Sequence, residues 1–278
     1  MTITHDNFTY IADLVRRKSA IVLGPGKEYL VEARLTPIAR DRMLSLDRYV
    51  ESVRARLNPA EHELIVEALT TNETSWYRDA QPFSALTGHI VPELRKERRI
   101  LPGLRVWSAA CSTGQEPYSI AMTLKEHFGG PSWTGPVPLV DILATDLSQQ
   151  VLDRSKQGRY TQLEINRGLP AHQLVRYFSR HGTEWELSPE IRSMVRFQRH
   201  NLLDTVPPGG PFDVVFLRNV LIYFDVHTKL EVLRKVRSAL RPGGFLILGA
   251  AETTVGLDDS WLRVPFGRSS IYQKVANA

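Results

Sequence analysis

The sequence contains only one cysteine, Cys111, so no disulfide can form within the chain. A single thiol also excludes thiolate metal clusters, and the eight histidines lack the paired spacing of zinc ligands. We therefore expect no bound metal, and a reducing compartment in which cysteines stay free.

Long apolar runs are missing as well. No stretch approaches the ~20 apolar residues that a membrane-spanning helix needs. The first six residues lack the basic and then apolar pattern of a secretory signal. Since 42% of the residues are hydrophobic and 23% are charged, we expect a globular, cytoplasmic protein without membrane insertion.

The charges are not balanced, and the formal net charge is +5 at pH 7. Such an excess favours an acidic partner, which can be a nucleic acid, lipid headgroups or a glutamate-rich protein surface. The charge alone does not choose among these three.

Residues 1–70 have the apolar periodicity of helices and little sign of strands. Ser45 and Asn58 are placed as N-caps, so a small helical domain is predicted. Most of its basic residues are arginines, which can simply be a solvated helix surface. The alternative is that Arg34, Arg40 and Arg42 form a face that grips carboxylates through bidentate guanidinium contacts.

The next stretch, residues 70–79, runs from polar side chains directly into Trp76, Tyr77 and Arg78. A cap and turn between helices would explain its polar residues but not the aromatic ones. A helix should begin at about Asp79 and turn its apolar side chains inward.

From Leu104 onward, strands alternate with helices, which predicts an α/β fold with a mostly parallel sheet. The predicted strands are 104–110, 140–145, 195–200, 212–217, 244–250, 262–266 and 270–275. The predicted helices are 116–128, 148–157 and 227–240, the last closed by a turn at residues 241–244. The alternation breaks between 158 and 195, where a short helix near 170–178 and an alternating pattern predict a small antiparallel insertion.

Residues 105–122 combine a strand, a turn of small residues and a helix start. Small residues let a ligand lie against the backbone, and the free N–H groups of the next helix can face it. Only Gly114 is a glycine in this turn, so a dinucleotide-binding fingerprint is a poor match. Taken alone, the turn can equally be an ordinary connection between a strand and a helix.

Polar side chains follow several of the predicted parallel strands, where ligands bind in open α/β sheets. They are Glu116, Asp146, Asn201 and the pair Arg218 and Asn219. Each could be a cap or loop residue, but their joint placement favours a binding site. Asp146 suits a ribose diol, because a carboxylate can accept hydrogen bonds from both hydroxyls.

Four motifs of the chain resemble those of the chemotaxis receptor methyltransferases of the CheR type: residues 70–79, 106–122, 142–148 and 212–225. The resemblance implies a class I S-adenosylmethionine-dependent methyltransferase (Rossmann-like) fold with a small antiparallel β-subdomain, preceded by an all-α domain. It divides the chain into a receptor-facing helical domain (1–70), a linker and helix (71–91), and a methyltransferase domain (92–278) with the insertion at about 158–195.

The resemblance also implies the activity. The chain would transfer a methyl group from S-adenosylmethionine to glutamate side chains of receptor cytoplasmic helices in sensory adaptation, leaving S-adenosylhomocysteine. It would act as a monomer without metal. The implied cofactor-binding residues are Asn72, Thr74, Arg78, Ala109, Gly114, Glu116, Asp146, Asn201, Leu202, Arg218 and Asn219.

Arg78 and Tyr223 are the implied positions nearest the transferable methyl. A glutamate with a pKa near ~4.3 is already ionised, so the reaction needs orientation and removal of water rather than a general base. Our hypothesis is that Arg78 orients the carboxylate by its charge and Tyr223 by its hydroxyl. The alternative for Tyr223 is packing at the sheet edge, and for Cys111 we expect a small buried side chain rather than a nucleophile.

Some family members bind a receptor-tail peptide on the β-subdomain. In this chain, the loop at residues 180–185 is a few residues shorter than expected for those members. We therefore expect an enzyme that needs no peptide tether. Two rival functions remain. The first is a nucleic-acid methyltransferase, which is disfavoured because the Asn-Pro-Pro-Tyr type motif is absent. The second is a non-catalytic adaptor that binds the cofactor.

Overall fold

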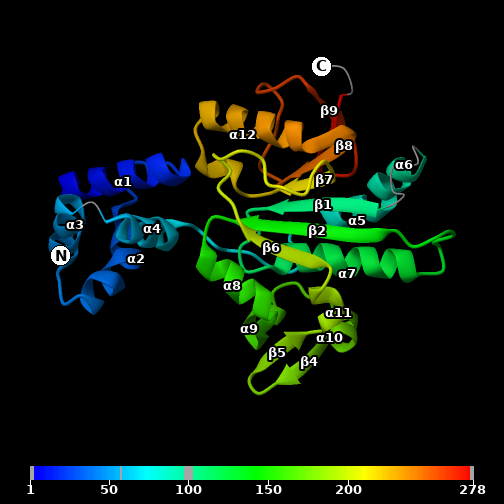
Figure 1. Cartoon of the computed structure of the whole chain (residues 1–278), viewed down its shortest axis with the longest axis horizontal. Helices are drawn as coiled ribbons and strands as arrows, with labels where there is room; N and C mark the ends of the chain where they lie inside the picture. The colour runs from blue at the N-terminus through cyan, green and yellow to red at the C-terminus, as the bar shows by residue number, and fades with distance from the viewer. Residues whose placement is uncertain (1–2, 57, 97–102, 276–278) are drawn as a thin grey trace. The chain divides into compact units, whose positions relative to one another are not determined.

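The computed structural model describes residues 3–56, 58–96 and 103–275. The chain forms two compact units (Figure 1). The first comprises Met1–Thr71 and Tyr223–Thr228, and the second comprises Asn72–Ile222 and Lys229–Ala278. Among the described residues, no helix is both long and apolar enough to cross a membrane.

The first unit is built around four helices: α1 (His5–Ser19), α2 (Glu28–Asp41), α3 (Leu46–Ala55) and α4 (Pro59–Leu69). The predicted caps are confirmed, since the Ser45 side chain accepts from the Arg48 N–H and Asn58 accepts from the Ala60 N–H. The helices bury one apolar face each, with Ile11, Val31 and Val50 fully inside.

The second unit contains a sheet of seven strands in the order β6-β2-β1-β7-β8-β10-β9. These are β1 (Gly103–Ala109), β2 (Leu139–Asp146), β6 (Val195–Arg199), β7 (Phe212–Leu217), β8 (Leu240–Leu248), β9 (Trp261–Val264) and β10 (Ser270–Lys274). The first five of that order pair in parallel, whereas β10 pairs antiparallel with both of its neighbours. The predicted mostly parallel sheet is thus confirmed.

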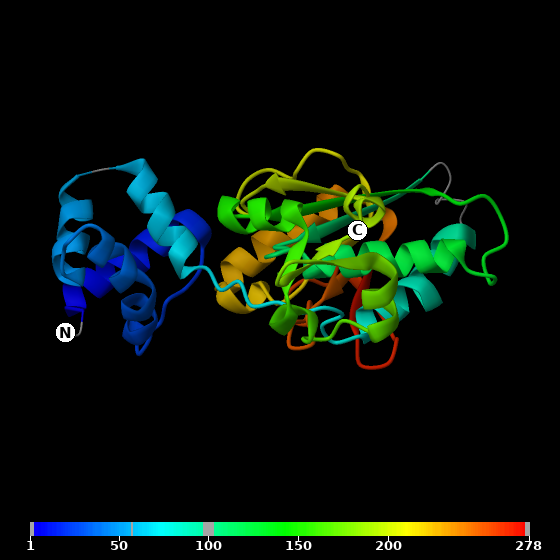
Figure 2. The same cartoon turned by 90° about the horizontal axis from the view of Figure 1, so that it is seen from below.

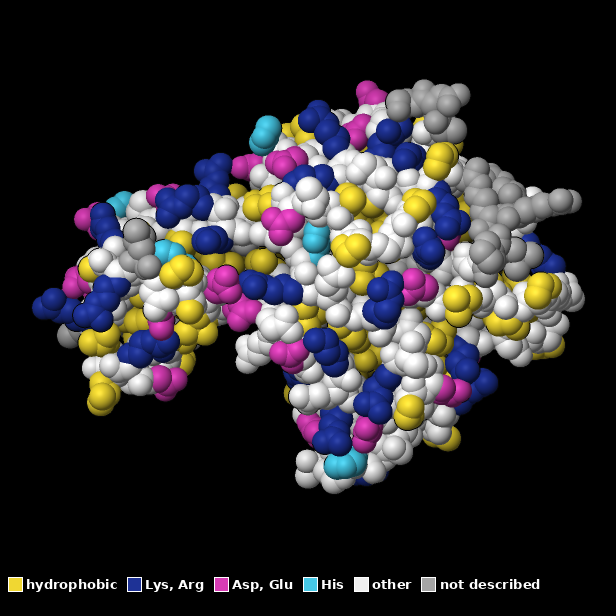
Figure 3. Space-filling view, viewed as in Figure 1, with side chains coloured by type: hydrophobic (Ala, Val, Ile, Leu, Met, Phe, Trp, Pro, Cys, Tyr) yellow, Lys and Arg dark blue, Asp and Glu magenta, His cyan; other side chains and the backbone are white. Residues whose placement is uncertain are grey.

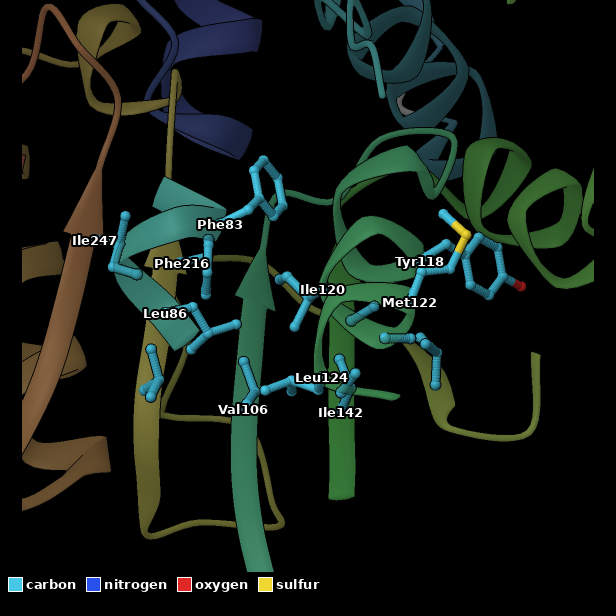
Figure 4. Packing of buried hydrophobic residues seen from close by; sticks show 14 of the residues in the cluster. Phe83, Leu86, Val106, Tyr118, Ile120, Met122, Leu124, Ile142, Phe216 and Ile247 are labelled. Atoms are coloured by element: carbon cyan, nitrogen blue, oxygen red, sulfur yellow. The ribbon is translucent and has the colours of Figure 1, made fainter. Parts of the chain in front are cut away.

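Helices cover both faces of this sheet (Figures 1 and 2). On one face lie α7 (Gln115–Gly129), α8 (Gln149–Gln157) and the consecutive segments α5 (Gln81–Ala85), η1 (Leu86–Ile90) and α6 (Val91–Lys96), while α12 (Val226–Ala239) lies on the other. Figure 4 shows Ile120 and Leu124 of α7 beside Val106 of β1 and Ile142 of β2, and Leu86 of η1 beside Phe216 of β7. Residues at alternate strand positions therefore fill two separate cores.

The order of the strands creates one switch point in the sheet. From β1 the chain moves to β2 and then β6, and it returns to place β7 on the opposite side of β1. Ligands of open α/β sheets bind at the carboxyl edge beside such a reversal. The loops that follow β1 and β7 are therefore the first place to look for a site.

The insertion forms a second, three-stranded antiparallel sheet in the order β3-β5-β4. Its elements are β3 (Arg159–Thr161), α9 (Gln162–Ile165), α10 (Ala171–Tyr177), β4 (Phe178–His181), β5 (Glu184–Leu187) and α11 (Pro189–Arg192). Only Gly182 and Thr183 connect β4 to β5, and Gly182 has a left-handed φ of 61° as such tight turns require.

One prediction about the sheet is wrong. Residues 241–244 do not form a turn ahead of the strand but belong to β8, which begins at Leu240. Leu240 pairs with Phe212, and pairing resumes between Phe245 and Val214 after an irregularity. The Pro and Gly residues that predicted a turn instead lie in an irregular stretch within β8.

Candidate functional site

The turn after β1 joins Ala109, the buried last residue of that strand, to the start of α7. Three of its residues have left-handed φ angles: Ala110 at 59°, Ser112 at 51° and Gly114 at 92°. A side chain on Gly114 would lie 3.1 Å from the Ser155 side chain, so glycine fits both the backbone angle and the space. Strained backbone of this kind is concentrated at binding sites.

Asp146 ends β2 and fixes this turn. Its buried carboxylate accepts hydrogen bonds from the Ser112 N–H (2.8 Å) and the Ser148 N–H (3.1 Å). Ser148 in turn caps α8 by accepting from the Val151 N–H. The carboxylate that sequence placed on a ribose therefore also connects the turn after β1 to the start of α8.

Arg218 follows β7 and is the buried centre of an ion-pair network. Its side chain is 2% exposed, and its guanidinium lies 2.9 Å from Glu116 Oε2 and 2.7 Å from Asp79 Oδ2. It also donates to the Arg78 carbonyl at 2.8 Å, while Glu116 Oε1 accepts from the Ser108 hydroxyl. Two carboxylates offset the desolvation of one buried guanidinium, so Arg218 ties residues 78–79 to the first turn of α7.

The stretch 72–79 is fastened to the second unit at several further points. The Ser112 hydroxyl donates to the Asn72 carbonyl (2.7 Å), and the Trp76 N–H donates to the Arg167 carbonyl (3.0 Å). The Trp76 ring is 1% exposed and contacts the edges of aromatic rings of the insertion. The buried Trp76 thus anchors the segment to the insertion, and the backbone of Asn72 holds it to the turn.

Left-handed residues occur in this segment as well, at Tyr77 (48°), Asp79 (62°) and Ala80 (26°). Such angles persist in residues other than glycine only where surrounding contacts hold them. The Tyr77 N–H donates to the Ser119 hydroxyl (3.2 Å), and Arg218 holds Asp79. Burial raises the pKa of the Tyr77 phenol to about 12, so it stays neutral at physiological pH.

Arg78 differs from Arg218. Its guanidinium donates to the carbonyl of Glu73 in its own segment (3.1 Å), and it forms no ion pair with a carboxylate of the described residues. The backbone of Arg78 is fixed by Arg218, but its charged end is not neutralised. Such a side chain can bind a carboxylate that comes from another molecule.

A cavity of about 740 Å³ brings the linker and the turn together. Asn72 and Thr74 line it from one side, and Thr113 of the turn and Gln115 at the start of α7 line it from another. Its outer wall is polar and comes from α8 and the insertion, including Arg154, Glu164 and Arg167. Glu116 and Asp146 are not among its lining residues, so this cavity joins only some of the predicted cofactor residues.

The remaining strand ends carry the predicted asparagines. Asn201 follows β6, where its side chain accepts from the Leu203 N–H (3.1 Å), and Leu202 beside it is partly exposed. The His200 N–H donates to the Asp146 carbonyl, which places the end of β6 beside the end of β2. Asn219 follows β7 with a left-handed φ of 57°.

Three residues of this edge were not found by sequence reasoning: Ser112, Asp79 and Glu252. Glu252 is buried and accepts backbone hydrogen bonds from both Asn219 and Gly249. It lies just past the last parallel strand, so the rule of polar residues at strand ends could have found it. Asp79 adjoins Arg78 in the stretch that sequence did single out.

Tyr223 and Arg34, two of the predicted site residues, lie in the first unit and make contacts within it. The Tyr223 carbonyl accepts from the Val22 N–H there, and the predicted role of its hydroxyl stays a prediction. Arg34 donates to the carbonyls of Ala68 and Thr70, so it closes the end of α4.

Arg40 and Arg42 are neighbours in sequence but not in their contacts. Arg42 pairs with Glu61 at 2.5 Å and lies over the Tyr49 ring. Arg40 is exposed and forms no ion pair with the described residues. Receptor binding by the three arginines stays a prediction.

Cys111 is 1% exposed inside the turn. Burial raises the pKa of its thiol, and the negative charges of Asp146 and Glu116 raise it further. A buried, protonated thiol is a poor nucleophile. The described residues also contain no group of three or more His, Cys, Asp or Glu side chains that could hold a metal ion.

Comparison with protein families gives matches over almost the whole chain. Residues 72–268 match the family model described as "CheR methyltransferase, SAM binding domain", and residues 6–70 match "CheR methyltransferase, all-alpha domain". Chemotaxis protein methyltransferase Cher2 of Pseudomonas putida is 42% identical over 272 residues, covering 96% of this chain and 97% of that protein. The Escherichia coli chemotaxis protein methyltransferase is 36% identical over 262 residues, covering 91% and 86%.

Proposed function

This chain belongs to the CheR methyltransferase family, and on that premise we propose that it methylates glutamate side chains of chemotaxis receptors. The methyl donor is S-adenosylmethionine, for which the family's second domain is named. The products are then a glutamate methyl ester and S-adenosylhomocysteine. The relatives act in chemotaxis by name, which supports a role in sensory adaptation.

The residues at the carboxyl edge of the sheet fit this cofactor. Asp146 and Glu116 place carboxylates beside the turn after β1, and a sulfonium is positively charged. The turns after β1 and β7 flank the switch point of the sheet, where such ligands bind. We propose that Asp146 holds the ribose, with the turn residues and Asn219 around the rest of the molecule.

When bound, the cofactor supplies an electrophilic methyl group. The chain itself has to hold an ionised glutamate in line with that methyl and exclude water from it. The observation that carries the proposal is the guanidinium of Arg78, which forms no ion pair with the described residues, on a backbone held by Arg218. We assign to Arg78 the orientation of the incoming carboxylate, and to the Tyr223 hydroxyl a second contact with it.

We propose that the helical domain faces the receptor, where exposed Arg40 meets acidic side chains of its helices. The two-residue connection Gly182–Thr183 supports an enzyme that works without a receptor-tail tether. We further propose that it acts as a monomer in the cytoplasm, where the receptor helices lie.

The direct test is incubation with S-adenosylmethionine labelled in its methyl group and a cytoplasmic receptor fragment. Label that base releases from the fragment as methanol supports the proposal, because esters hydrolyse in base. Label on RNA or DNA added to the same reaction would identify a nucleic-acid methyltransferase, and binding without transfer would identify an adaptor. On the face drawn in Figure 3, Lys and Arg side chains are interspersed with Asp and Glu, a pattern that favours protein over nucleic acid.

Calorimetry with a receptor-tail peptide tests the missing tether separately. We expect no heat of binding at micromolar peptide. Binding with a micromolar Kd would show that the insertion holds a tether despite its short turn.

A further inference from the structure

Glu252 makes an unusual number of backbone contacts for one side chain. Its Oε1 accepts from the N–H groups of Val220 (2.9 Å) and Leu221 (2.8 Å). Its Oε2 accepts from the N–H groups of Asn219 and Gly249, both at 2.8 Å. A carboxylate has about four acceptor positions, so all of them are filled by backbone donors.

These contacts join two loops at the carboxyl edge of the sheet. Asn219, Val220 and Leu221 follow β7, and Gly249 follows β8. Successive N–H groups that converge in this way form a concave site for an anion, and here the anion belongs to the chain itself. Glu252 is 5% exposed, so these bonds form away from solvent.

The loop that Glu252 holds carries residues of the proposed reaction. Asn219 adopts its left-handed φ of 57° directly beside the carboxylate, and Leu221 opens the single 3₁₀ turn Leu221–Tyr223. A left-handed residue other than glycine needs surrounding contacts to keep its conformation. The bonds to Glu252 are such contacts.

Gly249 confirms how closely the two loops approach. A β-carbon at this position would lie 2.7 Å from Glu252 Oε2 and 2.8 Å from Asn219 Nδ2. Only glycine leaves room for this arrangement. The close approach of the backbones and the four hydrogen bonds are thus two separate observations that the loops after β7 and β8 are held together at Glu252.

We propose that Glu252 is a positioning residue of the methyltransferase: it fixes the Asn219–Leu221 loop in the conformation that binds the cofactor. The proposal rests on the proposed function for the identity of that cofactor. Because its acceptor positions are filled, Glu252 acts through the backbone and does not touch the cofactor or the glutamate itself.

The main test compares Glu252→Gln with Asp213→Asn, measuring the Kd of S-adenosylhomocysteine and steady-state kinetics. The glutamine amide presents N–H groups to two backbone donors, so half of the contacts are lost. We expect the Kd to rise by about tenfold or more, as for the loss of a charge-assisted hydrogen bond, and kcat to fall. The KM for the receptor fragment should stay within about twofold of wild type.

Asp213 is a matched control at the opposite end of β7. It is 1% exposed and accepts from the Arg105 N–H (2.8 Å) and from Arg241 (3.0 Å). Asp213→Asn should lower the melting temperature but leave the Kd of S-adenosylhomocysteine within about twofold. An equal rise of the Kd in both variants, or an unchanged Kd in Glu252→Gln, would overturn the proposal.

Two further measurements keep the proposal testable if Glu252→Gln does not fold. Gly249→Ala should weaken S-adenosylhomocysteine binding, whereas Gly129→Ala, where a β-carbon meets nothing within 4 Å, should not. In the wild-type protein without cofactor, the amides of residues 219–221 should be protected from hydrogen exchange. Unprotected amides there would contradict the proposal. Since these are binding and exchange measurements, they remain decisive even if no base-labile methyl transfer is found.

Discussion

Arg218 and Arg78 both belong to the carboxyl edge of the sheet, but their guanidinium groups have different surroundings. Arg218 is buried and paired with Glu116 and Asp79, while Arg78 contacts a carbonyl of its own segment. The first unit repeats the contrast, because Arg42 is paired with Glu61 and Arg40 is not paired with any described carboxylate. In each pair, one arginine holds the protein together and the other keeps its charge available for a partner.

The largest effect should follow the removal of Arg218. Arg218→Met leaves the largely buried carboxylate of Glu116 without its cation, and breaking a buried ion pair typically costs about 3–5 kcal/mol of unfolding free energy. The pair with Asp79, whose side chain is 41% exposed, adds little to this loss. Urea unfolding measures this loss. Arg196→Ala is the control, since its pair with Asp141 is exposed and should contribute about 1 kcal/mol or less. Similar losses in both variants would remove the distinction between the two arginines.

Arg78→Ala should have the opposite profile. The unfolding free energy should stay within about 0.5 kcal/mol of wild type, because no ion pair of the described residues is lost. Methyl transfer should slow by about 100-fold, the order of effect of misplacing a reacting group. Parallel urea unfolding and steady-state assays check both halves. A destabilised variant with normal kcat would place Arg78 beside Arg218 as a structural residue.

The next largest effect is expected where the linker contacts the insertion, at Trp76 and Gly168. Gly168 has a φ of 98°, and a β-carbon there would collide with the Trp76 carbonyl. We expect Gly168→Ala to cost about 2 kcal/mol of unfolding free energy or more, from clash and backbone strain together. Gly182→Ala adds only the strain of its φ of 61°, and about 1 kcal/mol is expected. If the two variants unfold alike, the linker is not held at Trp76.

A smaller effect is expected for the free arginine of the first unit. Arg40→Ala should raise the KM for the receptor fragment by about 3- to 10-fold without changing stability, since it loses one exposed charge contact. Arg42→Ala removes the contact with Glu61 and should lower the melting temperature as well. The comparison fails if Arg40→Ala binds the fragment normally at low salt.

The smallest effect is expected at Cys111. Its raised pKa keeps the thiol protonated at pH 8, so iodoacetamide should not label the folded protein. Cys111→Ser should keep kcat within about twofold of wild type, because no step uses the thiol. Rapid labelling of the native protein, or a large loss confined to the methyl-transfer step, would contradict this.

Sequence reasoning found the residues that adjoin regular strands. Asp146 ends β2 and Arg218 follows β7, so their common edge could be predicted from the strand pattern. The partners of these residues could not be predicted, since Asp79 and Arg218 are 139 positions apart in the chain. Local patterns place a charged residue on an element, but its burial and its partner depend on how distant elements pack.

The prediction of a turn at residues 241–244 was wrong for a related reason. Pro242 and Gly243 are typical of turns, yet they lie within β8, where pairing with β7 is interrupted after Leu240 and resumes at Phe245. Trp76 is a second case. Its neighbours in sequence are polar, so its burial against the insertion could not be predicted from the local pattern. Both depend on tertiary contacts that local propensity does not contain.

The central claim is that Arg78, and not Arg218, presents a free charge to the glutamate. Its most direct test is the single-turnover rate of Arg78→Ala with saturating S-adenosylmethionine and receptor fragment, which isolates the chemical step from binding. We predict a rate about 100-fold below wild type, in a protein that remains folded. A rate within about twofold of wild type would contradict the account and leave Arg78 without a role in the reaction.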